Sequence, residues 1–326
     1  MKIKSHILLF MLIILLSLLC FSGCTIKGSN KETGGAPVRI ATINGPTGIG
    51  MVEMMTQPSK YEITVYQNPD ELIGKVITGE VDAASLPANV GAVLYNKTEG
   101  QILAVSPVTL GVLYIVQNVN DSAGCITSVS DLRGKTILAS GKGSSPEYIL
   151  DHLLKTAGID PQKDVSIKWL TSHTEVNAAL LTEQDAIAML PEPFVSIAAG
   201  KSPQISVALD LNQAWSEATG NPLAMSVFIV QKSFAEQRGE DLALLIGDYQ
   251  KSVAFVNENP NAPDLVAEKG LLADAALARQ AIPKCRIVFY TDRNEGASLL
   301  KAYYETLFAI DPKSVGGQPP NEDFYL

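Results

Sequence analysis

The sequence twice shows a β-rich run that enters a glycine turn and then a helix. In one copy, residues 135–140 (KTILAS) lead into the turn 141–145 (GKGSS), and Pro146 suits the first helical position because its missing N–H would have no partner there anyway. In the other copy, residues 38–43 (VRIATI) lead into the turn 44–50 (NGPTGIG), with a helix predicted from Met51. Such a junction directs free backbone N–H groups and the positive end of a helix at one spot. The repeated pattern therefore predicts a place for a small anion or a polar head group.

The remaining predicted elements also alternate between strand and helix. The order repeats in two series, and each series predicts a mainly parallel sheet with helices on its faces. The first series continues with strands at 61–67 and 81–85 and helices at 70–78 and 90–95; the second continues with strands at 165–170, 186–189 and 205–210 and a helix at 174–181.

Polar residues follow the predicted strands at points where parallel sheets bind ligands. Ligands lie beyond the carboxyl ends of such strands, and Thr47, Ser85 and Asn89 fall at those ends. Glu192 lies between two prolines, which prevent that backbone from continuing as a helix and display the residue at a strand end. We expect these side chains to belong to one site.

Two similar stretches, residues 113–117 (LYIVQ) and 227–231 (VFIVQ), flank the second series. We interpret them as paired crossing segments that join two lobes; two ordinary buried strands of similar composition are the alternative. Lobe 1 would then comprise residues 38–117 and 226–326, and lobe 2 residues 118–225. After the second crossing, the spacing predicts helices at 242–257, 263–269, 271–282 and 295–310.

The N-terminus has the pattern of an export signal. Lys2 and Lys4 precede an apolar run, residues 7–21, which is shorter than the roughly 20 residues of a membrane span. The run ends in Ser22-Gly23-Cys24, which resembles a bacterial lipobox, although Phe21 replaces the usual leucine. We predict a signal peptide over residues 1–23, lipidation of Cys24 and a flexible tether over residues 24–37, so that the protein is exported and held at the outer face of a membrane; plain secretion is the alternative.

The composition argues for a ligand binder rather than a catalyst. The formal net charge of −9 gives nucleic acid no basic surface to bind. The histidines His152 and His173 lack the GxSxG turn of a Ser/His/Asp hydrolase, and the phosphate-loop pattern fails because Val129 stands where a glycine is required. No catalytic residue, metal site or cofactor is predicted. Cys125 and Cys285 stand apart from any metal-binding pattern, and whether they form a disulfide is left open.

Together with the lipobox, four stretches resemble the substrate-binding lipoproteins of ABC importers of the nitrate, sulfonate and taurine type, which also include binders of thiamine pyrimidine precursors. The stretches are VRIATINGPTGIGM (38–51), SLPANVGAVLYNK (85–97), DLRGKTILASGKGSSPEYIL (131–150) and AIAMLPEPFV (186–195). The resemblance implies a type II periplasmic-binding-protein fold: two α/β lobes, two crossing strands, and a cleft that closes on the ligand.

The resemblance also implies a mechanism of capture by hinge closure and delivery to a membrane permease, by a monomer without cofactors. The candidate ligand-binding residues come from both predicted lobes: Gly45, Pro46, Thr47, Gly48, Ser85, Asn89 and Thr109 from lobe 1, and Gly143, Ser144, Ser145 and Glu192 from lobe 2.

The chemical class of the ligand is left open at this point. Turns rich in hydroxyl and N–H groups favour nitrate or a sulfonate, with Lys142 as the one nearby cation. Glu147 and Glu192 would instead favour an amine or an aminopyrimidine, if they face the cleft. An enzyme on the same fold, of the thiamine-pyrimidine or menaquinone pathway type, and a membrane-anchored ligand sensor are the other functional alternatives.

Overall fold

The chain forms two five-stranded sheets, each with helices packed against it. The computed structural model describes residues 35–67, 69–119 and 125–326. The first sheet contains β1 (Val38–Ile43), β2 (Tyr61–Tyr66), β3 (Ala83–Pro87), β4 (Ile102–Leu110) and β10 (Ala224–Gln231), in the order β2-β1-β3-β10-β4. The second contains β5 (Leu113–Asn118), β6 (Thr136–Ala139), β7 (Ser166–Trp169), β8 (Ile187–Pro191) and β9 (Ile205–Asp210), in the order β7-β6-β8-β5-β9.

The two sheets share one topology. In each sheet the first strand of the series pairs in parallel with the second and the third, as β1 does with β2 and β3, and β6 with β7 and β8. In each sheet one antiparallel strand lies between the third and the fourth: β10 in the first sheet and β5 in the second. This arrangement confirms the two predicted βα series and the two-lobed α/β fold.

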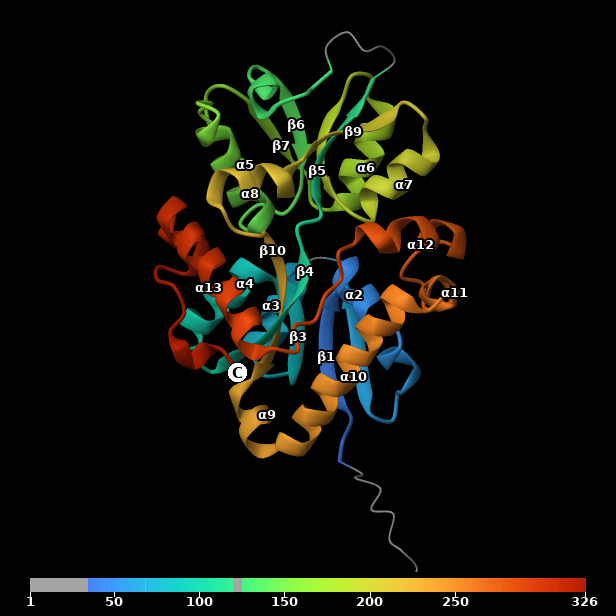
Figure 1. The fold of residues 1–326 in the computed structure, drawn as a ribbon, viewed down its shortest axis with the longest axis vertical. Coiled ribbons are helices and arrows are strands. Elements are labelled where there is room, and N and C mark those ends of the chain that lie inside the picture. The colour runs from blue at the N-terminus through green and yellow to red at the C-terminus, as the bar shows by residue number, and fades with distance from the viewer. Residues whose placement is uncertain (1–34, 68, 120–124) are drawn as a thin grey trace, which may run out of the picture. The chain divides into compact units, whose positions relative to one another are not determined.

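The helices follow the sheets to which their flanking strands belong. With the first sheet, called lobe 1, the chain places α2 (Pro46–Gly50), α3 (Pro69–Ile77), α4 (Ala88–Lys97), α9 (Lys232–Gln237), α10 (Gly239–Glu258), α11 (Ala262–Glu268), α12 (Ala275–Ala281) and α13 (Arg293–Ile310). With the second sheet, called lobe 2, it places α5 (Ser145–Thr156), α6 (His173–Thr182), α7 (Phe194–Lys201) and α8 (Leu211–Thr219). Figure 1 shows both sets within the compact unit of residues 37–326.

The similar stretches 113–117 and 227–231 do not pair with each other. The first is in β5 of lobe 2 and the second is in β10 of lobe 1, so each is the strand by which the chain enters a new sheet. Their likeness therefore reflects equivalent antiparallel positions between two buried neighbours. The crossing segments themselves are short, residues 111–112 and 220–223, which moves the boundary of lobe 1 from the predicted residue 117 to about residue 111 (Figure 1).

Helix α2 begins earlier than predicted. It spans Pro46–Gly50 rather than starting at Met51, because Gly45 adopts φ 127° and Pro46 then takes the first helical position. Residues of the expected helix 51–55 form turns and a short 3₁₀ segment, Met54–Thr56. The helix predicted over 271–282 is also shorter, since Asp274 caps α12 at its N-terminus by accepting a hydrogen bond from the Leu277 N–H.

Apolar side chains join the two lobes on one side. One buried cluster contains residues of both lobes, and in it the ring centroids of Trp215 on α8 and Tyr303 on α13 are 5.7 Å apart. His152 on α5 packs edge-on against Trp215. Two further clusters belong mainly to one lobe each. The lobes thus share a hydrophobic core at the α8–α13 contact.

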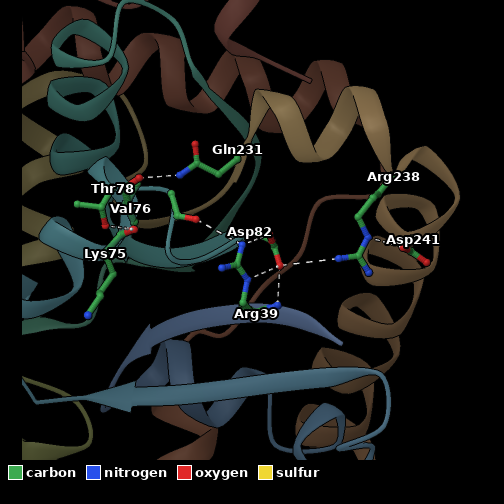
Figure 2. Close-up of polar contacts among 9 residues, drawn as sticks. Arg39, Lys75, Val76, Thr78, Asp82, Gln231, Arg238 and Asp241 are labelled. Carbon is green, nitrogen blue, oxygen red and sulfur yellow. Dashed lines mark hydrogen bonds and ion pairs between the residues drawn. The ribbon is translucent and has the colours of Figure 1, made fainter. Parts of the chain in front are cut away.

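A polar network lies at the amino ends of β1 and β3 in the first sheet. Asp82 accepts hydrogen bonds from the Arg39 backbone N–H at 2.9 Å and from Arg39 Nη2 at 2.6 Å. Arg238 Nη1 lies 3.9 Å from Asp82, and the Gln231 amide donates to the Val76 carbonyl at 2.6 Å (Figure 2). Because ligands bind beyond the carboxyl ends of the strands, this network serves the fold.

Candidate functional site

A cavity of about 350 Å³ is lined by residues from both lobes. Its volume is in the range of small-molecule sites. Its walls come from the segments that follow β1, β2, β3, β6, β7 and β8 and from the two places where the chain crosses between the lobes. Six of the residues predicted from the sequence line it: Pro46, Thr47, Thr109, Gly143, Ser144 and Glu192.

The structure leaves the five other predicted residues out of the cavity wall. Gly45 and Gly48 shape the turn into α2, and a Cβ atom on Gly48 would lie 3.2 Å from the Ile43 carbonyl oxygen. The Ser85 hydroxyl is buried 3.3 Å from the Tyr249 hydroxyl. Ser145 Oγ donates to Asn89 Oδ1 at 3.0 Å, which links α5 of lobe 2 to α4 of lobe 1. These hydroxyl and amide groups have partners within the protein: the Ser85–Tyr249 pair lies inside lobe 1, and the Ser145–Asn89 bond joins the two lobes.

The hydroxyl of Thr47 is oriented by its own backbone. Its Oγ1 donates to the Ile43 carbonyl at 2.7 Å, and the residue is 6% exposed. A hydroxyl has one proton and two lone pairs. Because the proton is committed to the carbonyl, Thr47 has acceptor lone pairs left for a ligand.

The turn after β6 is arranged in the same way. Ser144 Oγ donates to the Gly141 carbonyl at 2.7 Å, and the Ser144 N–H donates to the same oxygen at 3.1 Å. The Gly143 N–H donates to Glu147 Oε2 at 2.6 Å. Several donors of the predicted anion-binding turn therefore already have partners within the protein.

Glu192 lines the cavity with its carboxylate bound to the next helix. Its side chain accepts hydrogen bonds from the Ser196 N–H at 3.0 Å and from Ser196 Oγ at 3.1 Å, at the start of α7. The residue is 2% exposed, and this burial raises the pKa of the Glu192 carboxyl. Lys284 of lobe 1 reaches Ser196 Oγ at 3.4 Å, so the cap of α7 also forms a contact between the lobes.

Thr109 differs from the other hydroxyls of the wall. It lies on β4 just before the first crossing, is 1% exposed, and its Oγ1 has no hydrogen-bond partner among the described residues. A buried hydroxyl without a partner is destabilising, and a ligand that supplies the partner removes that cost. Thr109 is therefore the clearest candidate for a direct polar contact with a ligand.

Sequence reasoning did not include His173 among the candidate ligand-binding residues. The residue begins α6 and lines the cavity, and its Nδ1 is 2.7 Å from Ser140 Oγ. Its ring lies 5.1 Å from that of Phe194, another wall residue. Burial lowers the pKa of His173 to about 4, so the imidazole is neutral at pH 7. The available signal was a third junction of strand, turn and helix, at residues 166–175.

Trp215, Cys125 and Cys285 do not line the cavity. Trp215 is fully buried between His152 and Tyr303, so it packs the lobes together and does not stack on a ligand. Cys125 and Cys285, whose pairing the sequence left open, are both free. Cys285 is buried in the core of lobe 1, whereas Cys125 precedes the first 3₁₀ turn of lobe 2. Within the described ranges, no group of His, Cys, Asp and Glu side chains could hold a metal ion.

The two α/β lobes and their two crossing segments define a type II periplasmic-binding-protein fold. The structure is similar to an ABC transporter protein from Parabacteroides distasonis, with a TM-score of 0.72 and 22% identity over 90% of this chain and 99% of that one. It is also similar to the alkanesulfonate-binding protein SsuA from Xanthomonas axonopodis pv. citri bound to MOPS, with a TM-score of 0.66 and 16% identity over 85% and 93% of the two chains. The periplasmic nitrate-binding protein NrtA from Synechocystis PCC 6803 is more distant, with a TM-score of 0.60 and 11% identity over 77% and 69% of the chains.

The sequence itself is similar to one family over part of its length. Residues 52–209 match the family described as the periplasmic substrate-binding proteins of phosphonate ABC transporters. None of the curated proteins with which the sequence was compared matches it. Among the residues that the structure describes, no helix is long and apolar enough to span a membrane; the predicted signal peptide, residues 1–23, and Cys24 lie outside them.

Proposed function

We propose that this chain is the extracytoplasmic solute-binding component of an ABC importer, which captures a small solute between its lobes and delivers it to a membrane permease. The family match over residues 52–209 and the cavity between two lobes support this role. Capture proceeds by closure about the short crossing segments, residues 111–112 and 220–223. The lipobox-like sequence at Cys24 supports anchoring of the exported protein by a lipid.

The proposed solute is an aminopyrimidine-type compound that donates N–H groups, rather than a sulfonate or nitrate. The observation that carries this choice is the direction of the hydrogen bonds in the wall. Thr47 and Ser144 donate their hydroxyl protons to backbone carbonyls, and the Gly143 N–H donates to a carboxylate. The two hydroxyls therefore offer acceptor lone pairs to a ligand, and the occupied N–H offers no donor, whereas an oxyanion requires donors.

The charges of the wall favour the same class of solute. Asp70 and Glu192 bring carboxyl groups to the lining, whereas Lys142 is the one cationic side chain among the described lining residues, given a neutral His173. No arginine lines the described wall, although arginine is the residue best suited to two-point binding of an oxyanion. Apolar side chains, including Val90 and Phe194, provide surfaces for a flat ring.

A second candidate, an oxyanion, is favoured by the proteins to which this chain is similar. The matching family is described by phosphonate transport, and two of the structural relatives bind an alkanesulfonate or nitrate. Lys142 and the amino ends of α5 and α6 are the features of this chain that an anion would use. The two candidates differ in charge, and so they can be separated directly.

The proposal is tested by thermal-shift screening of residues 25–326. The panel contains aminopyrimidines, amino acids, nitrate, taurine, an alkanesulfonate and methylphosphonate. A solute present at 100 times its Kd raises the free energy of unfolding by about 2.7 kcal/mol. We expect stabilisation by an aminopyrimidine and none by the oxyanions. Stabilisation by oxyanions alone would reject the proposed solute class.

Substituting Thr109 with valine is expected to separate binding from stability. Valine keeps the shape of threonine and removes the unpartnered hydroxyl, so the free protein should be as stable as the wild type or more stable. Affinity for the bound aminopyrimidine should fall about 3- to 10-fold, the effect of one neutral hydrogen bond. Calorimetric titration and thermal melting of the same samples measure both quantities. An unchanged Kd would exclude Thr109 from ligand contact.

A further inference from the structure

The helices α5 and α6 begin with the same short pattern, Ser-x-x-Glu. In α5 the pattern is Ser144 to Glu147, and in α6 it is Ser172 to Glu175. In a capping box of this type, the serine is the N-cap and the glutamate returns to a backbone N–H at the start of the helix. Both helices begin at the wall of the cavity, so the two patterns face a common space.

Each glutamate binds the N–H one residue before the N-cap. Glu147 Oε2 accepts from the Gly143 N–H at 2.6 Å, and Glu175 Oε2 accepts from the Thr171 N–H at 3.1 Å. Gly143 and Thr171 both line the cavity. Two backbone donors, each next to the positive end of a helix, are thus occupied by carboxylates of the protein.

We propose that Glu147 and Glu175 determine solute specificity, because they occupy the N–H groups that an oxyanion would bind and place negative charge beside them. This inference rests on the proposed function and names residues that would produce its preference for amine-bearing solutes. An incoming oxyanion must displace a carboxylate or accept its repulsion. An uncharged N–H donor meets neither obstacle.

Two further features of the site support this assignment. The hydrogen bonds from Thr171 hold the pKa of the Glu175 carboxyl below its usual value, so this group is charged at neutral pH. The buried hydroxyl of Thr109, which has no partner among the described residues, lines the same cavity and marks it as a place where a ligand completes the hydrogen bonding.

A role in helix capping alone would give the same contacts, but it predicts a different result for variants of the two glutamates. If Glu147 and Glu175 only stabilise their helices, substitution lowers stability and leaves solute preference unchanged. If they also set specificity, substitution increases affinity for oxyanions. The decisive readout is therefore anion affinity, with stability measured in parallel.

The experiment uses methylphosphonate as the probe in calorimetric titrations of residues 25–326. E147A and E175A each free a backbone N–H and remove a charge, and each should bind methylphosphonate at least 10-fold more tightly than the wild type. The double variant E147A/E175A should gain more than either single variant. E147Q removes the charge but keeps a hydrogen-bond acceptor, and so it should gain less than E147A.

E183A is the matched control. Glu183 is a lobe 2 carboxylate outside the cavity lining, 3.6 Å from Lys168, and both side chains are about half exposed. Its removal changes the net charge by the same amount and should leave methylphosphonate affinity within twofold of the wild type. An equal gain in methylphosphonate affinity in E183A and E147A would show that the effect comes from net charge alone and would overturn the proposal.

Folded E147A and E175A with wild-type affinity for methylphosphonate would also overturn it. If an alanine variant is too unstable to titrate, E147Q and E175Q are measured instead, and the absence of any gain in both has the same meaning. The gain in methylphosphonate affinity is measured relative to the wild type. A wild type that itself prefers oxyanions would therefore reject the proposed solute class, and the effect of the two glutamates would still be judged from the ratio of Kd values.

Discussion

Replacing Trp215 with alanine is expected to lower the free energy of unfolding by about 3–5 kcal/mol, the usual effect of truncating a fully buried aromatic side chain. Trp215 is fully buried and contacts His152 of its own lobe and Tyr303 of the other lobe. Its removal opens a cavity in the apolar core that the lobes share. With an unfolding entropy of about 2.1 cal/mol/K per residue, a chain of this size should lose about 5–8 °C in Tm.

Differential scanning calorimetry of W215A and W169A measures this effect. Trp169, the other tryptophan of the chain, is only partly buried on β7 at the edge of the second sheet, so W169A should lose clearly less stability. W215F should recover part of the loss because phenylalanine refills part of the space. A Tm of W215A within 2 °C of the wild type would mean, at about the entropy used above, that Trp215 does not hold the lobes together.

The double variant T47A/S144A is expected to weaken solute binding about 5- to 150-fold without unfolding the protein. It removes one acceptor hydroxyl from each lobe, and two neutral hydrogen bonds are worth about 1–3 kcal/mol together. Each hydroxyl also donates to a carbonyl of its own turn, Ile43 for Thr47 and Gly141 for Ser144, so a modest loss of stability accompanies the loss of affinity. Calorimetric titration with the stabilising solute from the panel gives the ratio of Kd values.

The control for this variant is T98A/T182A. Thr98 and Thr182 also donate their hydroxyl protons to backbone carbonyls, at 2.7 Å and 3.0 Å, but neither residue lines the cavity. The control should show a comparable change in stability and an unchanged Kd. Equal affinity of T47A/S144A and the wild type would show that the two turns do not contact the solute.

The fold was accessible from the sequence because its signals are local. Alternating runs of strand and helix predicted both βα series, and the likeness of residues 113–117 and 227–231 located the two antiparallel strands, although it did not show that they belong to different sheets. The exact crossing points were not predictable, since residues 111–112 and 220–223 have no pattern that separates them from the strands they connect.

The site was only partly accessible for a different reason. Position at the carboxyl end of a strand places a residue near the ligand but does not set the direction of its side chain. Ser85, Asn89 and Ser145 are polar, yet none of them lines the cavity, and each bonds to a partner distant in sequence: Tyr249 for Ser85, and one another for Asn89 and Ser145. The donors lost to Glu147 and Glu175 likewise depend on side-chain geometry at the amino ends of two helices.

The central claim is that the cavity presents acceptors and therefore prefers an amine-bearing solute to an oxyanion. The most direct measurement is the ratio of two Kd values, for 4-amino-2-methylpyrimidine and for methanesulfonate, from calorimetric titrations of residues 25–326 at one pH and one ionic strength. The account predicts that the aminopyrimidine binds at least 10-fold more tightly. Tighter binding of methanesulfonate would contradict it and would mean that the N–H groups held by the glutamates are released to the ligand.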